Sequence, residues 1–241
     1  MYDIHCHVIP NIDDGARTMD EALALLQLAH SSGISHVVAT PHMHPGIFDN
    51  TPASIHQGLQ QLKQHIQDEG LDLQLAAAAE VRLCAELPRW IEADEVPYLG
   101  EYQGYKVLLL EFPHSHIPVG AEQLVKWLIG RDILPMIAHP ERNRDVQKNI
   151  KKLLPFRRMN CLLQLTASSV IGDMGEASLS TAVDLLEDNA VDVVATDAHN
   201  MHRRPPKLAE AHAAIAAVYG QEYADKLTKQ TPAQISQALY S

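Results

Sequence analysis

The first fifteen residues, MYDIHCHVIPNIDDG, carry several side chains that can bind a metal ion. His5 and His7 are separated by one residue, and Asp13 and Asp14 follow a few positions later. Because alternate residues of a β-strand point to the same face, an extended segment would direct both imidazoles at one ion. Imidazole and carboxylate ligands without thiolate suit manganese, iron or zinc. The spacing therefore indicates a metal site and leaves the metal open among these three.

Further residues of metal-ligand type stand at the ends of other apolar runs. They are His42, Glu80, Glu111, His139, Asp197 and His199, in addition to His5 and His7. Any one of them alone would usually be a hydrogen-bonded residue of the protein interior. Together they would bury many ionisable groups in equivalent positions, which is costly unless a metal neutralises them. We therefore interpret the whole set as a metal centre.

The apolar runs have the length and composition of β-strands, and they alternate with segments of helical periodicity. The predicted strands are 2–8, 35–40, 73–83, 105–112, 133–140, 160–167 and 191–199; the predicted helices are 19–33, 53–70, 121–132, 149–159 and 179–189. Such alternation predicts a parallel sheet, and about seven units of this size favour a closed α/β barrel. In a parallel barrel the carboxyl ends of all strands open on one face, so the candidate ligands would converge there.

The composition bounds the class of protein. A chain of 241 residues with 46% hydrophobic residues predicts one domain over 1–241. Its formal net charge of -11 argues against a nucleic-acid partner, because such binding depends on clustered Lys and Arg. No signal peptide or apolar run long enough for a membrane span is recognisable, so we expect a cytoplasmic protein without membrane insertion.

Cys6, Cys84 and Cys161 are widely spaced and form no C-x-x-C pair, which is typical of free thiols in a reducing compartment. None of them is followed by arginine six positions later, the spacing with which thiolate-dependent tyrosine phosphatases bind phosphate. The sequence therefore excludes that cysteine chemistry.

Several segments, in order, resemble the motifs of the PHP (polymerase and histidinol phosphatase) superfamily, and more narrowly its CpsB-type capsule and exopolysaccharide tyrosine phosphatases. They are DIHCHVIPNIDDG, VVATPHMHPG, AAEVRL, LLLEFP, PMIAHPERN, LLQLTASSVIG and ATDAHNMHRRPP. H-x-H alone is a weak signal, whereas this ordered series is specific. The resemblance runs from residue 2 to the terminal TPAQI and so covers essentially the whole chain.

The resemblance implies an α/β fold, a single distorted (β/α)7 TIM-like barrel with three divalent metal ions. We expect manganese, with iron, zinc or cobalt as alternatives. The implied ligands are His5, His7, Glu80 and Asp197 for one ion, Glu80, Glu111 and His139 for a second, and Asp14, His42 and His199 for a third. Asp13 would then turn the loop, although spacing alone does not separate it from Asp14. Six metal charges against four ligand carboxylates would leave a cationic pocket for a phosphate dianion.

The resemblance also implies the chemistry. A hydroxide bridging two metals would attack phosphorus, since coordination lowers the pKa of water from 15.7 to about 7. Arg142 in HPERN and Arg204 in RRPP match arginines that would clamp phosphoryl oxygens, a role suited to the planar guanidinium. Without these motifs, both would be read as surface salt-bridge residues. A tyrosyl leaving group, with a pKa of about 10, needs less help from a general acid than an alkyl alcohol.

The function implied is metal-dependent hydrolysis of phosphotyrosine in protein. The expected substrate is the tyrosine-rich tail of a bacterial tyrosine autokinase that controls polysaccharide export. The alternative is a small-molecule phosphomonoesterase of the histidinol-phosphatase type on the same barrel. Short connections favour the first, because they leave an open mouth suited to a protein tail. A binding module without turnover would be expected to have lost some of the ligands. The oligomeric state stays open.

Overall fold

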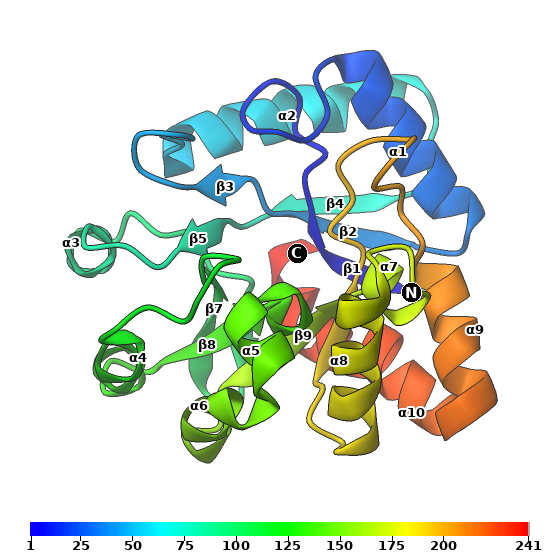
Figure 1. The fold of residues 1–241 in the computed structure, drawn as a ribbon. Helices are drawn as coiled ribbons and strands as arrows, with labels where there is room; N and C mark the ends of the chain where they lie inside the picture. The colour runs from blue at the N-terminus through cyan, green and yellow to red at the C-terminus, as the bar shows by residue number, and fades with distance from the viewer. Residues whose placement is uncertain (241) are drawn as a thin grey trace.

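The structure is a computed structural model, and it describes residues 1–240 (Figure 1). Its strands are β1 (Tyr2–Cys6), β2 (His36–Ala39), β3 (His42–Met43), β4 (Gln74–Ala77), β5 (Glu80–Arg82), β6 (Glu101–Tyr102), β7 (Tyr105–Glu111), β8 (Ile133–Ala138), β9 (Leu162–Thr166) and β10 (Val193–Ala195). All the segments predicted as strands contain strands, although most of these strands are shorter than predicted. Two strands lie outside the predicted segments: β3, and β6, which forms an antiparallel hairpin with β7.

The parallel strands surround one interior. One path of hydrogen-bonded strands runs β10-β9-β8-β7-β5-β3, and a second runs β1-β2-β4. The chain passes directly from β2 into β3 and from β4 into β5, so the two paths are continuous there. On the other side, His7 N donates to Ala198 O at 2.8 Å and Asp197 N donates to His5 O at 2.7 Å, which joins β1 to the residues after β10. The predicted α/β fold with parallel strands is confirmed.

Helices cover the outside of the strands on every side of the view in Figure 1. The α-helices are α1 (Met19–Ser31), α2 (Pro52–Asp68), α3 (Leu87–Glu92), α4 (Ala121–Ile129), α5 (Arg144–Lys148), α6 (Leu154–Arg158), α7 (Ala167–Val170), α8 (Glu176–Glu187), α9 (Leu208–Tyr219), α10 (Gln221–Asp225) and α11 (Thr231–Ser236). Short 3-10 turns lie at η1 (Pro140–Arg142), η2 (Ile150–Leu153) and η4 (Gln237–Tyr240), and a π-helical turn forms η3 (Lys226–Gln230). Among residues 1–240, none of the helices combines the length and the apolar character of a membrane span.

The predicted helix 149–159 is wrong as a single element. Residues 150–153 form the 3-10 turn η2, and α6 follows from Leu154 with Pro155 in its first turn. Proline lacks the backbone N–H that a helix interior needs and is tolerated in a first turn. The proline therefore marks the start of a new helix.

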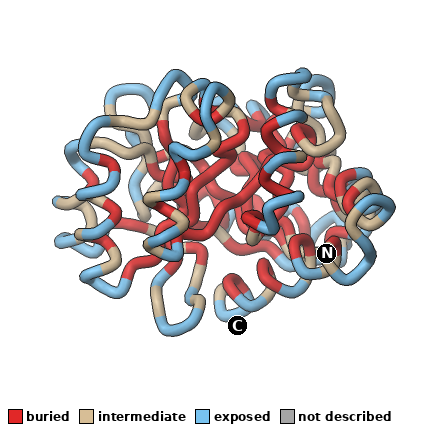
Figure 2. The backbone as a smooth tube through the Cα atoms, turned by 60° about the horizontal axis from the view of Figure 1, so that its bottom comes forward, coloured by how far each residue is buried: buried red, intermediate tan, exposed pale blue. Residues whose placement is uncertain are grey.

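Two apolar layers hold the barrel. The inner layer fills the space between the strands and includes Ile4, Val38, Leu109 and Met136. The outer layer joins the strands to the helices and includes Cys6. Figure 2 shows the buried strands enclosed by helices whose outer sides are exposed. The inner layer thus fills the barrel below the polar residues at the carboxyl ends of the strands.

A register shift in β1 sets the direction of His5. Asp3 pairs with Val37 but Cys6 pairs with Ala39, so β1 holds one residue more than β2 between these pairs. Such a bulge re-aims side chains and is common next to active sites. Ile4 lies in the inner apolar layer, Cys6 lies in the outer one, and the His5 imidazole is fully buried beside other ionisable groups.

Candidate metal centre

His5, His7, Glu80 and Asp197 form a buried cluster at the carboxyl ends of the strands. One nitrogen or oxygen atom from each lies within 4.8 Å of the corresponding atoms of the other three. Glu80 Oε2 is 3.3 Å from the Nε2 atoms of both histidines, and Asp197 Oδ1 is 3.4 Å from His5 Nε2 and 3.3 Å from His7 Nε2. This cluster has the same members as the first predicted ligand set.

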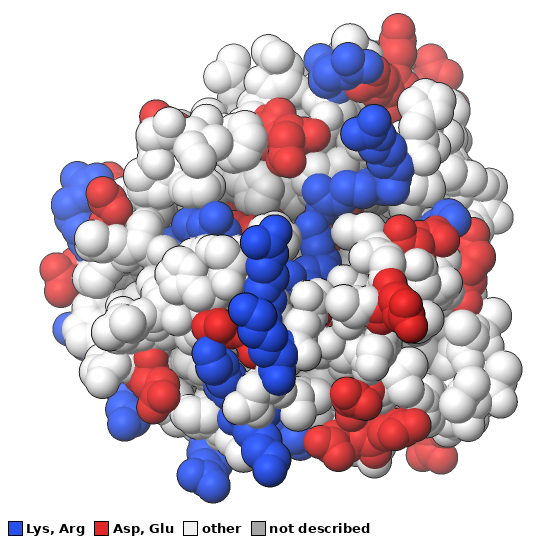
Figure 3. Space-filling model, in the orientation of Figure 1, with Lys and Arg blue, Asp and Glu red and all other residues white. Residues whose placement is uncertain are grey.

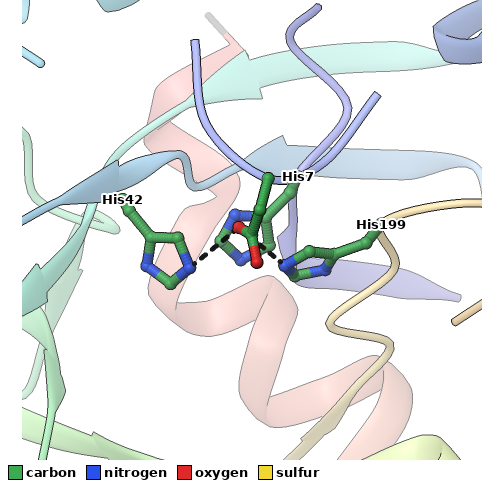
Figure 4. A group of neighbouring side chains, drawn as sticks. His7, His42 and His199 are labelled. Carbon is green, nitrogen blue, oxygen red and sulfur yellow. Dashed lines mark ion pairs between the residues drawn. The ribbon is translucent and has the colours of Figure 1, made fainter. Parts of the chain in front are cut away.

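A second cluster contains Asp14, His42 and His199 together with His7, again within 4.8 Å. Asp14 Oδ1 is 3.3 Å from His42 Nε2 and 3.3 Å from His199 Nε2. In Figure 4 the three imidazoles surround one carboxylate, and each comes from a different part of the chain. The third predicted ligand set is thus brought together, and His7 lies beside it.

The remaining predicted set is arranged differently. His42, Glu80 and Glu111 form the third cluster, in which His42 Nδ1 is 3.0 Å from Glu80 Oε2. His139 approaches from the other side, with Nε2 2.8 Å from Glu80 Oε1. Glu80 therefore lies between the clusters, where a bridging carboxylate would be placed. The assignment of each residue to a particular ion stays a prediction.

Buried atoms without hydrogen-bond partners mark where a cation fits. Within residues 1–240, Glu80 Oε2, Asp197 Oδ1, His42 Nδ1 and His199 Nε2 are buried and make no hydrogen bond. An unpaired buried polar atom costs about 1–3 kcal/mol, and more when it is charged. All four atoms belong to the three clusters. Oxygen and nitrogen ligands in this arrangement fit divalent metal ions.

Three histidines are oriented by their second ring nitrogen. His5 Nδ1 lies 2.7 Å from Gln164 Oε1, His7 Nδ1 lies 2.7 Å from Asp13 Oδ2, and His199 Nδ1 lies 2.9 Å from the carbonyl oxygen of Asp197. Because each acceptor fixes the proton on Nδ1, the Nε2 lone pair is left for the cluster. The sequence analysis did not identify Gln164. Its signal is a polar residue inside the apolar strand LLQLT.

Asp13 and Asp14 have different surroundings. The Asp13 carboxylate also accepts hydrogen bonds from Gly15 N at 2.9 Å and His42 N at 3.1 Å, so its oxygens are occupied by the protein. Asp14 instead faces two imidazoles. These surroundings favour Asp14 over Asp13 as the candidate ligand, and its assignment stays a prediction.

Arg142 and Arg204 both donate to Asp197 Oδ2, the oxygen that faces away from His5 and His7. Asp197 therefore lies between the imidazole cluster and two guanidinium groups. Arg82, a residue that the sequence analysis did not single out, lies with Nη1 2.9 Å from Glu111 Oε1 and donates to Phe112 O at 3.1 Å. Its signal is the spacing in EVR, because alternate residues of a strand share a face.

Two of the candidate ligands have unusual backbone angles. His139 has φ 33° and Asp197 has φ 51°, both in the left-handed region. For residues other than glycine, such conformations cost roughly 1–3 kcal/mol and cluster at functional sites. The strain places these side chains at the points where β8 and β10 end.

The ionisation of the cluster follows from burial and from neighbouring charges. Burial and the charge of Arg142 lower the pKa of His139 to about 3, and burial with His7 lowers the pKa of His199 to about 4. These imidazoles are thus neutral at physiological pH, the form that binds a metal. Burial and the charge of Glu80 raise the pKa of Glu111 to about 7. For His42, burial disfavours the cation, but the contacts with Glu80 and Asp14 together outweigh burial and raise the pKa to about 10.

Comparison with known proteins adds independent findings. The sequence pattern of the capsular polysaccharide synthesis family CpsB/CapC matches residues 1–237. The tyrosine-protein phosphatase YwqE of Bacillus subtilis is 32% identical over 229 residues, which cover 95% of this chain and 89% of YwqE. The tyrosine-protein phosphatase CpsB of Streptococcus pneumoniae is 29% identical over 244 residues, which cover 98% of this chain and 98% of CpsB.

Solved structures of other proteins are also similar to this chain. A chain from the crystal structures of YwqE and CpsB, described as metal-dependent tyrosine phosphatases, superposes with a TM-score of 0.91 at 30% identity, covering 98% of this chain and 94% of that one. An organophosphorus hydrolase from Deinococcus radiodurans superposes with a TM-score of 0.58 at 14% identity, covering 100% and 92%. That second likeness shows a shared fold alone.

Proposed function

Because this chain belongs to the CpsB/CapC family of capsular polysaccharide synthesis proteins, we propose that it is a metal-dependent protein-tyrosine phosphatase. It hydrolyses phosphotyrosine in proteins and acts in the synthesis of capsular or extracellular polysaccharide. One observation of the site carries the proposal. Four buried nitrogen and oxygen atoms of Glu80, Asp197, His42 and His199 have no hydrogen-bond partner among the described residues, and all belong to clusters that fit a cation.

The proposed catalytic unit is one domain of residues 1–241 with three divalent ions, most simply Mn²⁺. His5, His7, Glu80 and Asp197 hold the first ion. Glu111 and His139 join Glu80 at the second, and Asp14, His42 and His199 hold the third. The close approach of His42 Nδ1 to Glu80 Oε2 supports placing the second and third ions side by side. When bound, divalent ions would supply Lewis acidity and would lower the pKa of a coordinated water molecule to about 7.

The protein's own residues prepare this site in three ways. Gln164, Asp13 and the Asp197 carbonyl fix the ring orientation of His5, His7 and His199. Arg142 and Arg204, held at the edge of the cluster by Asp197 Oδ2, bind non-bridging phosphoryl oxygens of the substrate. The departing tyrosyl group, with a pKa of about 10, leaves without a dedicated acid.

The proposed partner is the tyrosine-rich tail of a bacterial tyrosine autokinase in the cytoplasm. Supporting this, the curated relatives YwqE and CpsB are named tyrosine-protein phosphatases. The net charge of -11 disfavours nucleic acid as a substrate.

The test compares phosphate release from a tyrosine-phosphorylated peptide and from histidinol phosphate, using chelator-treated protein with Mn²⁺ restored. We expect Mn²⁺-dependent turnover of the peptide, lost in the double variant His5→Ala His7→Ala. The matched control is His56→Ala His65→Ala, which removes two exposed imidazoles from α2 and leaves turnover intact. Preference for histidinol phosphate would transfer the protein to the metabolic phosphatases. Absence of turnover on both substrates with metal bound would reject the proposed phosphomonoesterase.

A further inference from the structure

The segment from Arg142 to Arg158 concentrates positive charge beside the metal centre. It contains seven of the chain's 19 Lys and Arg residues and a single acidic residue, Asp145. The chain as a whole has a formal net charge of -11. A local excess of this size in an acidic protein is an electrostatic feature that attracts anions.

Most of this positive charge is not neutralised within the described chain. Asp145 Oδ2 pairs with Lys152 Nζ at 2.9 Å, and Arg157 lies 4.0 Å from Asp188. Four exposed residues of the segment make no ion pair with any residue in 1–240: Arg144, Lys148, Lys151 and Arg158. We call these four residues the basic strip.

The basic strip starts at the metal centre. Arg142, which donates to Asp197, is followed by Asn143, whose side chain caps α5 by accepting from Asp145 N at 2.9 Å and Val146 N at 3.3 Å. The first residue of α5 is Arg144, whose N–H donates to His114 O at 2.8 Å. Two residues of chain span at most roughly 7 Å, so the strip begins close to a guanidinium of the site.

The charges continue along α5 and into the next turn. Arg144 and Lys148 lie four positions apart on α5, which separates them along the helix by roughly 6 Å. Lys151 follows in the 3-10 turn η2, after the extended residue Asn149. Figure 3 shows Lys and Arg side chains gathered in a band that passes over α5 toward α6.

Charge elsewhere on the rim is mixed. Asp49 lies between β3 and α2, Asp173 between α7 and α8 pairs with Lys207, and Arg203 and Arg204 follow β10. In a parallel barrel these loops belong to the same rim as α5. The basic strip therefore adds unpaired positive charge to this rim and attracts an anionic chain along it.

We propose that the basic strip docks further negative charges of the phosphotyrosine substrate, so that the preferred substrate is a segment carrying additional phosphotyrosines or carboxylates near the target residue. This inference rests on the proposed function and names the substrate class of that same site. An extended peptide rises roughly 3.3 Å per residue, so a second anion about three residues from the target lies about 10 Å away from it, far enough to leave the metal centre for the neighbouring basic strip. A neutral peptide enters the metal centre without using the strip.

Binding and turnover test this separately. The binding probes are two peptides that carry a non-hydrolysable phosphonate analogue of phosphotyrosine. One has neutral flanks, and the other has a second analogue three residues before or after the first. Wild-type protein is expected to bind the peptide with two analogues about tenfold more tightly, as a few exposed charge contacts allow. The preference should disappear in Arg144→Gln Lys148→Gln Lys151→Gln. It should also fall as ionic strength rises from about 0.05 to about 0.5 M, because salt screens exposed charges.

The matched control removes one Arg and two Lys elsewhere, as Lys63→Gln Arg89→Gln Lys226→Gln, all exposed residues on other elements. This control should keep the preference. Hydrolysis of a small aryl phosphate should stay within about twofold in both triple variants, because neither touches the metal clusters. Equal binding of the two peptides by wild type, or an equal loss in both triple variants, would overturn the docking role. If Arg144→Gln Lys148→Gln Lys151→Gln lost binding to vesicles rich in anionic lipid but kept the peptide preference, the basic strip would be a membrane-binding surface. That result would also overturn the docking role.

Failure of the proposed function would look different. Metal-loaded protein would then hydrolyse neither the aryl phosphate nor a neutral-flank phosphotyrosine peptide. The binding ratio would still be measured, because the phosphonate probes require no turnover.

Discussion

Asp13 Oδ2 lies 2.7 Å from His7 Nδ1, so the aspartate next to a candidate ligand orients that imidazole from behind. The Asp13 carboxylate also accepts from Gly15 N and His42 N, which ties the loop after β1 to the residue that begins β3. Its neighbour Asp14 is directed toward His42 and His199. The two adjacent aspartates thus have different roles: Asp13 orients His7, and Asp14 faces the proposed ion.

Substitution of these two aspartates should separate their roles. Asp14→Ala is expected to remove about one bound ion per chain, since it deletes a ligand. Asp13→Ala should keep the full number of ions at saturating metal but weaken affinity by about 10–100-fold, the usual cost of losing a residue that orients a ligand. Metal content measured by mass spectrometry across a Mn²⁺ titration distinguishes them. Identical titrations for the two variants would contradict the assignment.

Gln164 should matter to metal binding although it is not a ligand. Gln164 Oε1 lies 2.7 Å from His5 Nδ1, and Gln164 Nε2 donates to Leu165 O at 2.7 Å. Gln164→Leu removes the acceptor, frees the His5 tautomer, and should weaken metal affinity by about 10–100-fold. Gln164→Glu keeps an acceptor for His5 and should retain more of that affinity. If both variants bound Mn²⁺ as wild type does, the orienting role would be wrong.

Arg142 and Arg204 are predicted to bind phosphate as well as Asp197. Replacing either by lysine keeps the charge and loses the planar fork, so kcat/KM for a phosphotyrosine peptide should fall by about 10²-fold. Inorganic phosphate should also inhibit less strongly, which an ion pair with a purely structural role would not cause. Metal content is the control. A variant with full metal content, unchanged phosphate inhibition and unchanged kcat/KM would contradict the clamp.

The cysteines should be dispensable at neutral pH. Burial raises the pKa of Cys161 to about 12, and burial with the charge of Asp3 raises the pKa of Cys6 well above its usual value. Burial also raises the pKa of the half-buried Cys84. Thiolate therefore forms only as the pH rises toward these values, and iodoacetamide at pH 7 should leave turnover within about twofold. Rapid inactivation that tracks alkylation of one cysteine would favour a thiolate mechanism.

Part of this site could be predicted from sequence because it depends on local rules. Alternation along a strand pairs His5 with His7, and the one-sided opening of a parallel barrel gathers residues such as Glu80 and Asp197 that lie far apart in the chain. The strands themselves were predictable from their apolar runs and their alternation with helices. The same reasoning also placed His42, Glu111 and His139 at the mouth.

Other features depend on how elements meet in three dimensions. The bulge in β1 comes from its register against β2, and no pattern in the segment YDIHC indicates it. Gln164 and Arg82 act on residues that are distant in sequence, so only the closed barrel brings them to His5 and Glu111. That His42 rather than His139 shares one cluster with both Glu80 and Glu111 is likewise a matter of packing. The break before α6 was readable in principle from Pro155.

The most direct test of the central claim is turnover of a phosphotyrosine peptide as Mn²⁺ is returned to chelator-stripped protein, with bound metal measured in the same samples. The metal clusters around Glu80 predict no turnover at the start and activity that rises with occupancy to about three ions per chain. Full turnover by protein with almost no bound metal would contradict the claim that these clusters are the catalytic centre.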